Sequence, residues 1–273
     1  MRNKITLAGD LGSGKSTVAD LLLPRIGATY YGTGKIARQV AARLGMDIAA
    51  FNIHMETHPE LDWEIDEPLT HLADKPECMI VDSRMAWHFT KGSYRVFLVT
   101  DARVAALRIL NAGRSTEHFD SEEEAAARIR ARKESEKKRY FDLYHVNCKD
   151  LFNYDLVVDT TYATPEEVAD EIERGYRAWQ EGEDAPTCLL SPKRLFYPDD
   201  APDEEKVSAY HTALECGRAV EKPTVVSQDD NFYLTGAPEV ALAYALAERT
   251  FVPVTLVHET VDPAHYVKME DTL

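Results

Sequence analysis

The sequence predicts an α/β fold, with a mostly parallel sheet flanked by helices and a second, smaller α/β domain after it. Three observations predict this fold. Short apolar runs alternate with longer helical patterns over the first part of the chain, which is typical of a parallel sheet covered on both faces. A glycine-rich motif stands between the first apolar run and the first helical pattern. A polar break at 182–186 separates two stretches that differ in their pattern of predicted helices and strands. We therefore place one domain at 1–182 and another at 187–273.

The first strand, Ile5–Ala8, leads into the segment Gly9–Thr17, which is a complete G-x-x-x-x-G-K-[ST] phosphate-binding loop followed directly by a helix. Its glycines let successive backbone N–H groups converge on phosphate oxygens, and the helix N-terminus adds partial positive charge. The residues predicted to bind phosphate are Gly9, Gly12, Ser13, Gly14, Lys15, Ser16 and Thr17. Among these, Lys15 should reach the outer phosphates and the Ser16 hydroxyl should ligate Mg²⁺. The motif predicts a bound nucleotide.

The rest of the first domain continues the alternation. Strands are predicted at 28–31, 78–82, 94–99 and 154–159, and helices at 32–44, at 47–72 with a break near 58–59, after 101, from 121 onward and at 164–181. The strand at 78–82 is an apolar run that ends in a carboxylate, Asp82, which indicates a buried parallel strand. Asp101 is the predicted N-cap of the next helix, and a capping box begins at Thr164.

The second domain is predicted to contain a small set of helices and strands of its own. A helix is predicted at 203–218, strands at 223–226, 232–234 and 252–257, a turn at 229–231, and an apolar helix at 240–248. No phosphate loop occurs in it, and we assign it no activity. Its apolar helix could pack on the first domain or on another subunit, so self-association or a protein partner through this domain stays open.

Composition narrows the function classes. The chain carries 47 acidic and 31 basic residues, for a formal net charge of −16, which argues against a general nucleic-acid-binding surface. No apolar stretch is long enough to span a membrane, and the first four residues lead into the phosphate-loop strand rather than into a signal-peptide core. We therefore expect a cytoplasmic protein. The four cysteines lie far apart and predict neither a zinc site nor a disulfide framework.

Arginines along the first domain distinguish the kinds of phosphate-loop protein. A kinase that joins two phosphorylated ligands must neutralise their repulsion and stabilise the transferring phosphoryl group, so it needs cations from several parts of the chain and a lid that excludes water. The candidate cations are Arg38, Arg84, Arg108, Arg114, Arg128, Arg130, Arg132 and Arg139. Arg132 and Arg139 are two helical turns apart and share a helix face. Any single arginine is more often a solvated surface residue, so only their convergence would indicate a site.

Five segments carry a family resemblance. They are Gly9–Thr17, Gly32–Arg38, Pro59–Asp66, Val81–Trp87, and Arg132–Tyr140 with its continuation to Thr160. On these segments, residues 1 to about 180 resemble cytidylate kinases, particularly the compact archaeal-type family of phosphate-loop nucleoside monophosphate kinases. The last segment is the most specific, because several identities stand at fixed spacing. The second domain, over 190–260, weakly resembles the ParB-like/sulfiredoxin fold, without the histidine and arginine residues that such proteins use.

The first resemblance implies a reaction and a set of roles. Members of the family transfer a phosphoryl group from ATP to CMP or dCMP with Mg²⁺. By resemblance, Arg38 and Arg84 grip the acceptor monophosphate, and Arg132 and Arg139 contact phosphates during transfer. Arg108 or Arg114 lies near ATP. No dedicated base is required, because the attacking oxygen already belongs to an anionic phosphate.

Some interpretations stay open at this point. Asp82 could hold a Mg²⁺-bound water or could cap the turn that follows it. Asp62 and Asp66, with Trp63, could read a base edge or form a solvated helix face, and we favour the latter. The chain could also phosphorylate another small acceptor, or act as a nucleotide-binding regulator whose second domain engages a partner.

Overall fold

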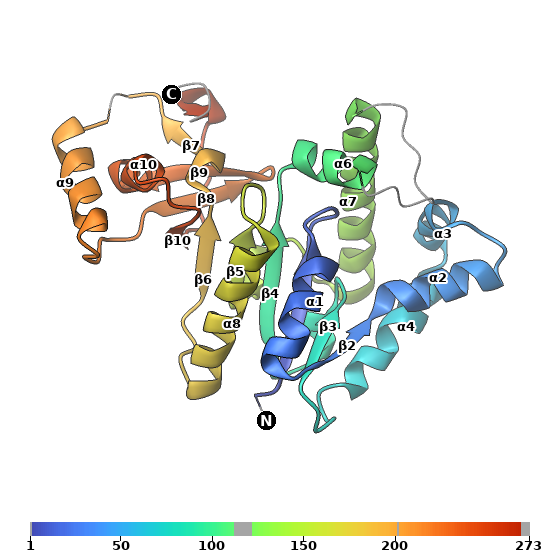
Figure 1. Cartoon of the computed structure of the whole chain (residues 1–273). Helices are drawn as coiled ribbons and strands as arrows, with labels where there is room; N and C mark the ends of the chain where they lie inside the picture. The colour runs from blue at the N-terminus through green and yellow to red at the C-terminus, as the bar shows by residue number, and fades with distance from the viewer. Residues whose placement is uncertain (1, 112–121, 201, 269–273) are drawn as a thin grey trace. The chain divides into compact units, whose positions relative to one another are not determined.

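The structure is a computed structural model that describes residues 2–111, 122–200 and 202–268 of the chain. It divides into two compact units. Unit 1 comprises Met1–Leu156 and Thr164–Ala185, and unit 2 comprises Val157–Ala163 and Pro186–Leu273 (Figure 1). The predicted α/β class is confirmed.

A parallel sheet forms the centre of unit 1, with the strand order β2-β3-β1-β4. Its strands are β1 (Lys4–Gly9), β2 (Thr29–Gly32), β3 (Met79–Asp82) and β4 (Tyr94–Val99). Asp82 at the end of β3 is in register with Leu7 of β1 and Gly32 of β2, and Gly9 is in register with Leu98 of β4. The carboxyl ends of these strands therefore bring the phosphate loop and Asp82 to one edge of the sheet, where ligands bind in open α/β sheets.

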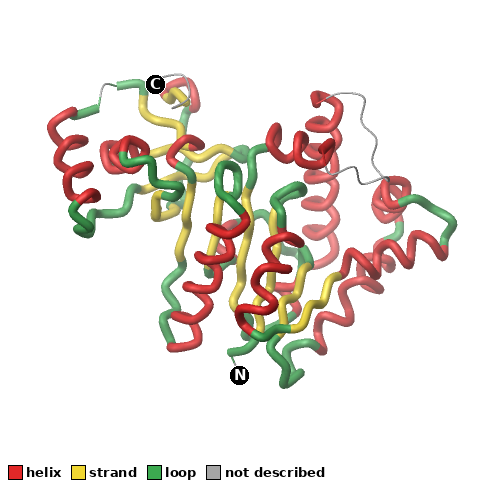
Figure 2. Tube along the Cα trace, viewed as in Figure 1, coloured by secondary structure: helices red, strands yellow, loops and turns green. Residues whose placement is uncertain are grey.

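Helices flank this sheet (Figure 2). They are α1 (Lys15–Ile26), α2 (Thr33–Arg43), α3 (Ile48–His54), α4 (Pro59–Asp66), α5 (Ala86–Phe89), α6 (Ala102–Asn111), α7 (Glu122–Tyr144) and α8 (Pro165–Glu181), with 3₁₀ turns at Met55–Thr57, Glu67–His71 and Leu151–Asn153. Figure 1 shows α1 beside α8, and alanines of α6 and α7 share a buried cluster. The two predicted caps are confirmed: Asp101 accepts from the backbone N–H of Arg103, and Thr164 forms a capping box.

Close packing explains two glycines of the phosphate loop. Gly9 has a φ of 155°, and a Cβ there would lie 2.6 Å from the Leu98 carbonyl oxygen. Gly12 has a φ of 75°, and its Cβ would lie 2.9 Å from Ala105 on α6. A side chain at either position would meet both a strained backbone and a rigid neighbour.

We expect Gly9→Ala to destabilise the protein by about 2–4 kcal/mol, since it combines backbone strain with a clash against β4. Chemical denaturation would measure this loss. Gly45→Ala is the control, because Gly45 also has a positive φ (70°) but meets nothing within 4 Å. If the two variants lose the same stability, close approach to Leu98 is not the cause.

Unit 2 is a mixed sheet with helices. Its elements are β5 (Leu156–Asp159, whose first residue belongs to unit 1), β6 (Thr187–Leu190), β7 (Leu195–Pro198), α9 (Glu204–Glu215), β8 (Thr224–Gln228), β9 (Asn231–Gly236), α10 (Pro238–Leu246), β10 (Val252–Leu256) and β11 (Tyr266–Lys268), with 3₁₀ turns at Pro192–Arg194 and Pro263–His265. From β6 onward the strand order is β6-β10-β8-β9-β7-β11. Three of these strands, β6, β7 and β11, were not predicted, and the expectation that 252–257 is the last strand is wrong.

Three further features concern the described residues only. The apolar helix α10 packs against α9 within unit 2, with Val240, Ala241 and Ala243 buried and Leu246 exposed. No helix in the described ranges has both the length and the apolar character that crossing a membrane requires. Cys78, Cys148, Cys188 and Cys216 are free thiols.

Candidate active site

Lys15 lies inside the phosphate loop, at the start of α1. Its Nζ donates to the carbonyl oxygens of Gly9 and Asp10, at 3.2 and 3.1 Å. Burial, followed by repulsion from Arg84, lowers the pKa of Lys15 to about 7. An anion bound in the loop would favour the charged form, so this lysine is suited to a phosphate.

Arg84 and Arg132 meet at one buried carboxylate, Glu136. The Nε of Arg84 donates to Glu136 Oε2 at 2.8 Å, and the Nε of Arg132 donates to Oε1 at 3.0 Å. Arg84 follows β3, whereas Arg132 and Glu136 lie on α7. Arg84 is also close enough to Lys15 to depress its pKa. Two predicted site arginines are thus brought together beside the phosphate loop.

A second cluster surrounds Asp10, the residue after the first glycine of the loop. Its carboxylate accepts from Lys149 Nζ at 2.8 Å, pairs with Lys133 Nζ at 3.2 Å and accepts from the Thr100 backbone N–H at 3.1 Å. Burial alone would raise the pKa of Asp10, but Lys149 and Lys133 outweigh it and hold this pKa well below its usual range.

Lys133 and Lys149 were not among the predicted site residues. Lys133 lies next to Arg132 in the most specific family segment, so its position carried a signal. Lys149 lies in a loop with no recognisable spacing, and only the fold brings it to Asp10.

The remaining residues predicted to lie near ATP, and the other candidate arginines, do not all lie at the phosphate loop. Arg108 on α6 donates to the Gly12 carbonyl oxygen and to Thr100 Oγ1, both at 3.4 Å, so it lies against the phosphate loop. Ser13 is buried and its Oγ donates to the Asp10 carbonyl oxygen at 2.8 Å, which closes the loop on itself. Arg114 lies outside the described residues. Arg128 is solvent-exposed and forms an i,i+4 pair with Glu124, so it stands apart from the cluster.

Asp82 and Ser16 are the predicted metal residues. The half-buried Asp82 accepts from the Tyr30 hydroxyl at 2.8 Å through Oδ2. The turn after Asp82 is instead bonded by Ser83, whose Oγ accepts from the Met85 N–H at 3.3 Å, so the interpretation of Asp82 as its cap is wrong. Asp82 acts electrostatically on Lys15, which places it at the loop. One carboxylate and one hydroxyl beside bound phosphates are oxygen donors of the kind Mg²⁺ takes, so the residues fit this ion.

Asp62 and Asp66 lie one turn apart on α4 and are each only 3 % exposed. The interpretation of these carboxylates as a solvated helix face is therefore wrong, although Trp63 between them is half-exposed. Asp62 pairs with Arg139 Nε at 3.3 Å, and Asp66 accepts from the Tyr144 hydroxyl at 3.3 Å. Burial raises the pKa of Asp62 to about 6. Burial, and then the charge of Asp62, raise the pKa of Asp66 to about 7.

Arg139 belongs to this second group rather than to the phosphate loop. Besides Asp62, it donates through Nη1 to the Asn52 carbonyl oxygen at 3.0 Å. Arg38 is exposed on α2, where its charge acts on the Tyr30 hydroxyl that binds Asp82. The structure thus separates the predicted residues into a cation cluster at the loop and a buried carboxylate pair on α4.

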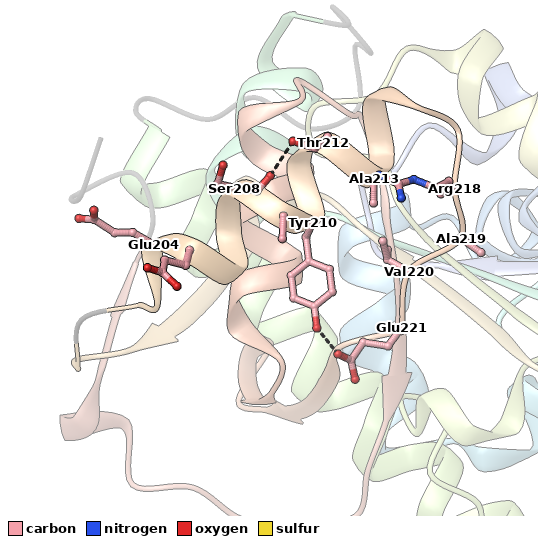
Figure 3. A pocket seen from close by; sticks show the side chains of 11 residues that line it. Glu204, Ser208, Tyr210, Thr212, Ala213, Arg218, Ala219, Val220 and Glu221 are labelled. Atoms are coloured by element: carbon pink, nitrogen blue, oxygen red, sulfur yellow. Dashed lines mark hydrogen bonds between the residues drawn. The ribbon is translucent and has the colours of Figure 1, made fainter.

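Unit 2 contains a separate open groove of about 930 Å³ along α9 (Figure 3). Two of its polar groups have partners: the Tyr210 hydroxyl donates to Glu221, and Thr212 Oγ1 donates to the Ser208 carbonyl oxygen at 2.9 Å. Its lining has one arginine, Arg218, and the carboxylates of Glu204 and Glu205 would repel a phosphate. The predicted site residues all belong to unit 1.

Several known proteins are similar to this chain in sequence or in fold. The family model described as "Cytidylate kinase-like family" matches residues 4–162, more than half of the chain. The cytidylate kinase of Thermoplasma volcanium is 38% identical over 170 residues, covering 61% of this chain and 87% of that protein. The cytidylate kinase of Methanothermobacter thermautotrophicus is 35% identical over 156 residues, covering 57% and 94%. Among solved structures, shikimate kinase from Acinetobacter baumannii in complex with shikimate has 15% identity and a TM-score of 0.43, covering 67% and 96%.

The matched residues contain the phosphate loop, the Arg84–Glu136–Arg132 cluster and the carboxylate pair on α4. The chain belongs to the cytidylate kinase-like family and is a nucleotide kinase.

Proposed function

We propose that the chain transfers the γ-phosphoryl group of ATP to CMP or dCMP, with Mg²⁺. The observation that carries the proposal is the pairing of two sites in unit 1. A cluster of cations surrounds the phosphate loop. A pair of buried carboxylates, Asp62 and Asp66, lies on α4, the helix whose acidic residues could read the base of the acceptor.

The cations suit the donor and the transferring group. The phosphate loop and Lys15 would hold the β- and γ-phosphates of ATP, with Arg108 beside them. Arg84 and Arg38 would bind the acceptor monophosphate, and Arg132 would approach the transferring group from α7. Because the attacking phosphate oxygen is already anionic, orientation and charge neutralisation supply most of the catalysis.

The carboxylates suit a cytosine. Asp66 and Asp62, whose pKa values are raised to about 7 and about 6, can together present an ionised acceptor and a protonated donor near neutral pH. An ionised carboxylate accepts from the exocyclic amino group of cytosine, which uracil lacks. We assign base recognition to this pair, with Arg139 holding Asp62 in place.

Ser16 and Asp82 would hold Mg²⁺, the latter directly or through a water molecule. When bound, the ion neutralises charge on the transferring phosphates.

A coupled ADP-release assay across CMP, dCMP, UMP, AMP, GMP and shikimate tests the proposal. We expect CMP or dCMP to give the highest kcat/KM. Turnover confined to a different acceptor would contradict the cytidylate assignment, and ATP hydrolysis without any acceptor dependence would contradict the kinase reaction itself.

Metal removal should abolish the reaction. With EDTA in excess, we expect CMP-dependent ADP release to fall to background and added Mg²⁺ to restore it, because charge on the phosphates is otherwise not neutralised. Full activity in EDTA would contradict the role given to Ser16 and Asp82. An Asp82→Asn variant should need a higher Mg²⁺ concentration for half-maximal rate.

A further inference from the structure

Glu136 is a buried carboxylate shared by two arginines. Its side chain is 8 % exposed. One oxygen, Oε2, accepts from Arg84 Nε at 2.8 Å, and the other, Oε1, accepts from Arg132 Nε at 3.0 Å. A single side chain of α7 therefore fixes one arginine from its own helix and one from the loop after β3.

This contact sets the direction of the Arg84 guanidinium. Glu136 engages Arg84 through Nε, and no bond to the terminal nitrogens of Arg84 is recorded among the described residues. A guanidinium held at Nε keeps its outer edge available for a bidentate contact with phosphate. The carboxylate thus orients the arginine without taking the place of the phosphate.

The same contact balances charge. Burial and then repulsion from Arg84 lower the pKa of Lys15, so the cluster carries like charges at close range. Burial alone would raise the pKa of Glu136, but Arg84, Arg132 and Lys149 outweigh it and hold this pKa well below its usual range. Glu136 is therefore an anion throughout the working pH range, and it reduces the net positive charge that a phosphate ligand meets.

We infer that Glu136 is a positioning residue: it orients Arg84 and Arg132 toward the transferring phosphoryl group and limits how tightly these arginines bind ground-state phosphates. The inference rests on the proposed phosphoryl transfer. It predicts that removing the negative charge has opposite effects on binding and on turnover, which loss of a merely structural contact does not produce.

Glu136→Gln is the test, because glutamine keeps the size of the side chain and one oxygen acceptor. We expect kcat with CMP to fall about 10- to 100-fold, since the arginines lose their orientation. We expect the dissociation constant for inorganic pyrophosphate, measured by calorimetry, to fall about 3- to 10-fold, because a nearby negative charge is gone. In an Arg132→Met background the same substitution should change kcat much less, since one of the oriented groups is absent.

Glu134→Gln is the matched control, because Glu134 is an exposed glutamate two residues away on the same helix. It should leave both quantities unchanged. A folded Glu136→Gln protein with unchanged kcat and pyrophosphate affinity would overturn the inference, and so would a parallel loss of kcat, affinity and melting temperature. If the wild-type protein does not phosphorylate CMP, the proposed function fails, and the pyrophosphate affinities still decide whether Glu136 restrains anion binding.

Discussion

Lys15→Met should lower kcat for ATP-dependent phosphorylation of CMP by about 10³-fold or more, because it removes the cation that the loop directs at the transferring phosphates. The reason is local. The Lys15 Nζ donates hydrogen bonds to the carbonyl oxygens of Gly9 and Asp10 and therefore lies inside the loop. Methionine has a side chain of similar length but carries no charge at this position.

The fold should survive this substitution. Burial and Arg84 lower the pKa of Lys15 to about 7, so the folded protein holds the charged lysine at a cost that is greatest below pH 7 and disappears as the pH rises toward the usual lysine pKa. The melting temperature of Lys15→Met at pH 7 should therefore equal or exceed that of the wild type. Lys91→Met, at an exposed lysine of unit 1, is the control and should retain full activity. Retention of more than a tenth of the wild-type kcat in Lys15→Met would contradict the role assigned to the loop.

Asp66→Asn should stabilise the protein and weaken its choice of base. In the folded state the pKa of Asp66 is about 7, raised by burial and then by Asp62. Between the unfolded value near 4 and about 7, the folded state binds more protons than the unfolded state, so this residue makes stability fall as pH rises through that window. Asparagine removes the penalty. We expect a gain on the order of 2–4 kcal/mol at pH 8 and little change at pH 4.

The same variant should lose activity. Asparagine can still accept from the Tyr144 hydroxyl, but it removes one of the two carboxyl groups that are proposed to share a proton and to read the cytosine. We expect kcat/KM for CMP to fall about 10- to 100-fold relative to UMP. Denaturant melts at pH 4 and pH 8, with acceptor kinetics, measure both effects. Asp74→Asn, at an exposed position, is the control for stability and for kinetics. A loss of stability at pH 8 would show that the fold does not penalise the ionised form of Asp66 and would contradict its raised pKa.

Local signals in the sequence were sufficient to predict unit 1. The phosphate loop is a run of consecutive residues, and the strands at 78–82 and 94–99 are mostly apolar runs, so both could be predicted without tertiary information. The strands β6, β7 and β11 of unit 2 have three or four residues each, too few to show a period.

The site was harder to predict where burial decides the chemistry. Helix α4 has acidic residues at 60, 62, 64 and 66, a pattern that resembles a solvated face. Only the packing around it buries Asp62 and Asp66 while leaving Trp63 half-exposed. Similarly, the sequence does not distinguish Glu136 from the other charged residues of a long charged helix. Its contact partner Arg84 is 52 positions away in the sequence. Composition and periodicity cannot reveal such long-range contacts.

Transfer of label from [γ-³²P]ATP tests the central claim most directly. With wild-type protein, Mg²⁺ and equal concentrations of CMP and UMP, we expect label to appear in CDP well before UDP, with little inorganic phosphate. Lys15→Met should yield neither product. Label found only in inorganic phosphate, at a rate independent of CMP, would contradict it.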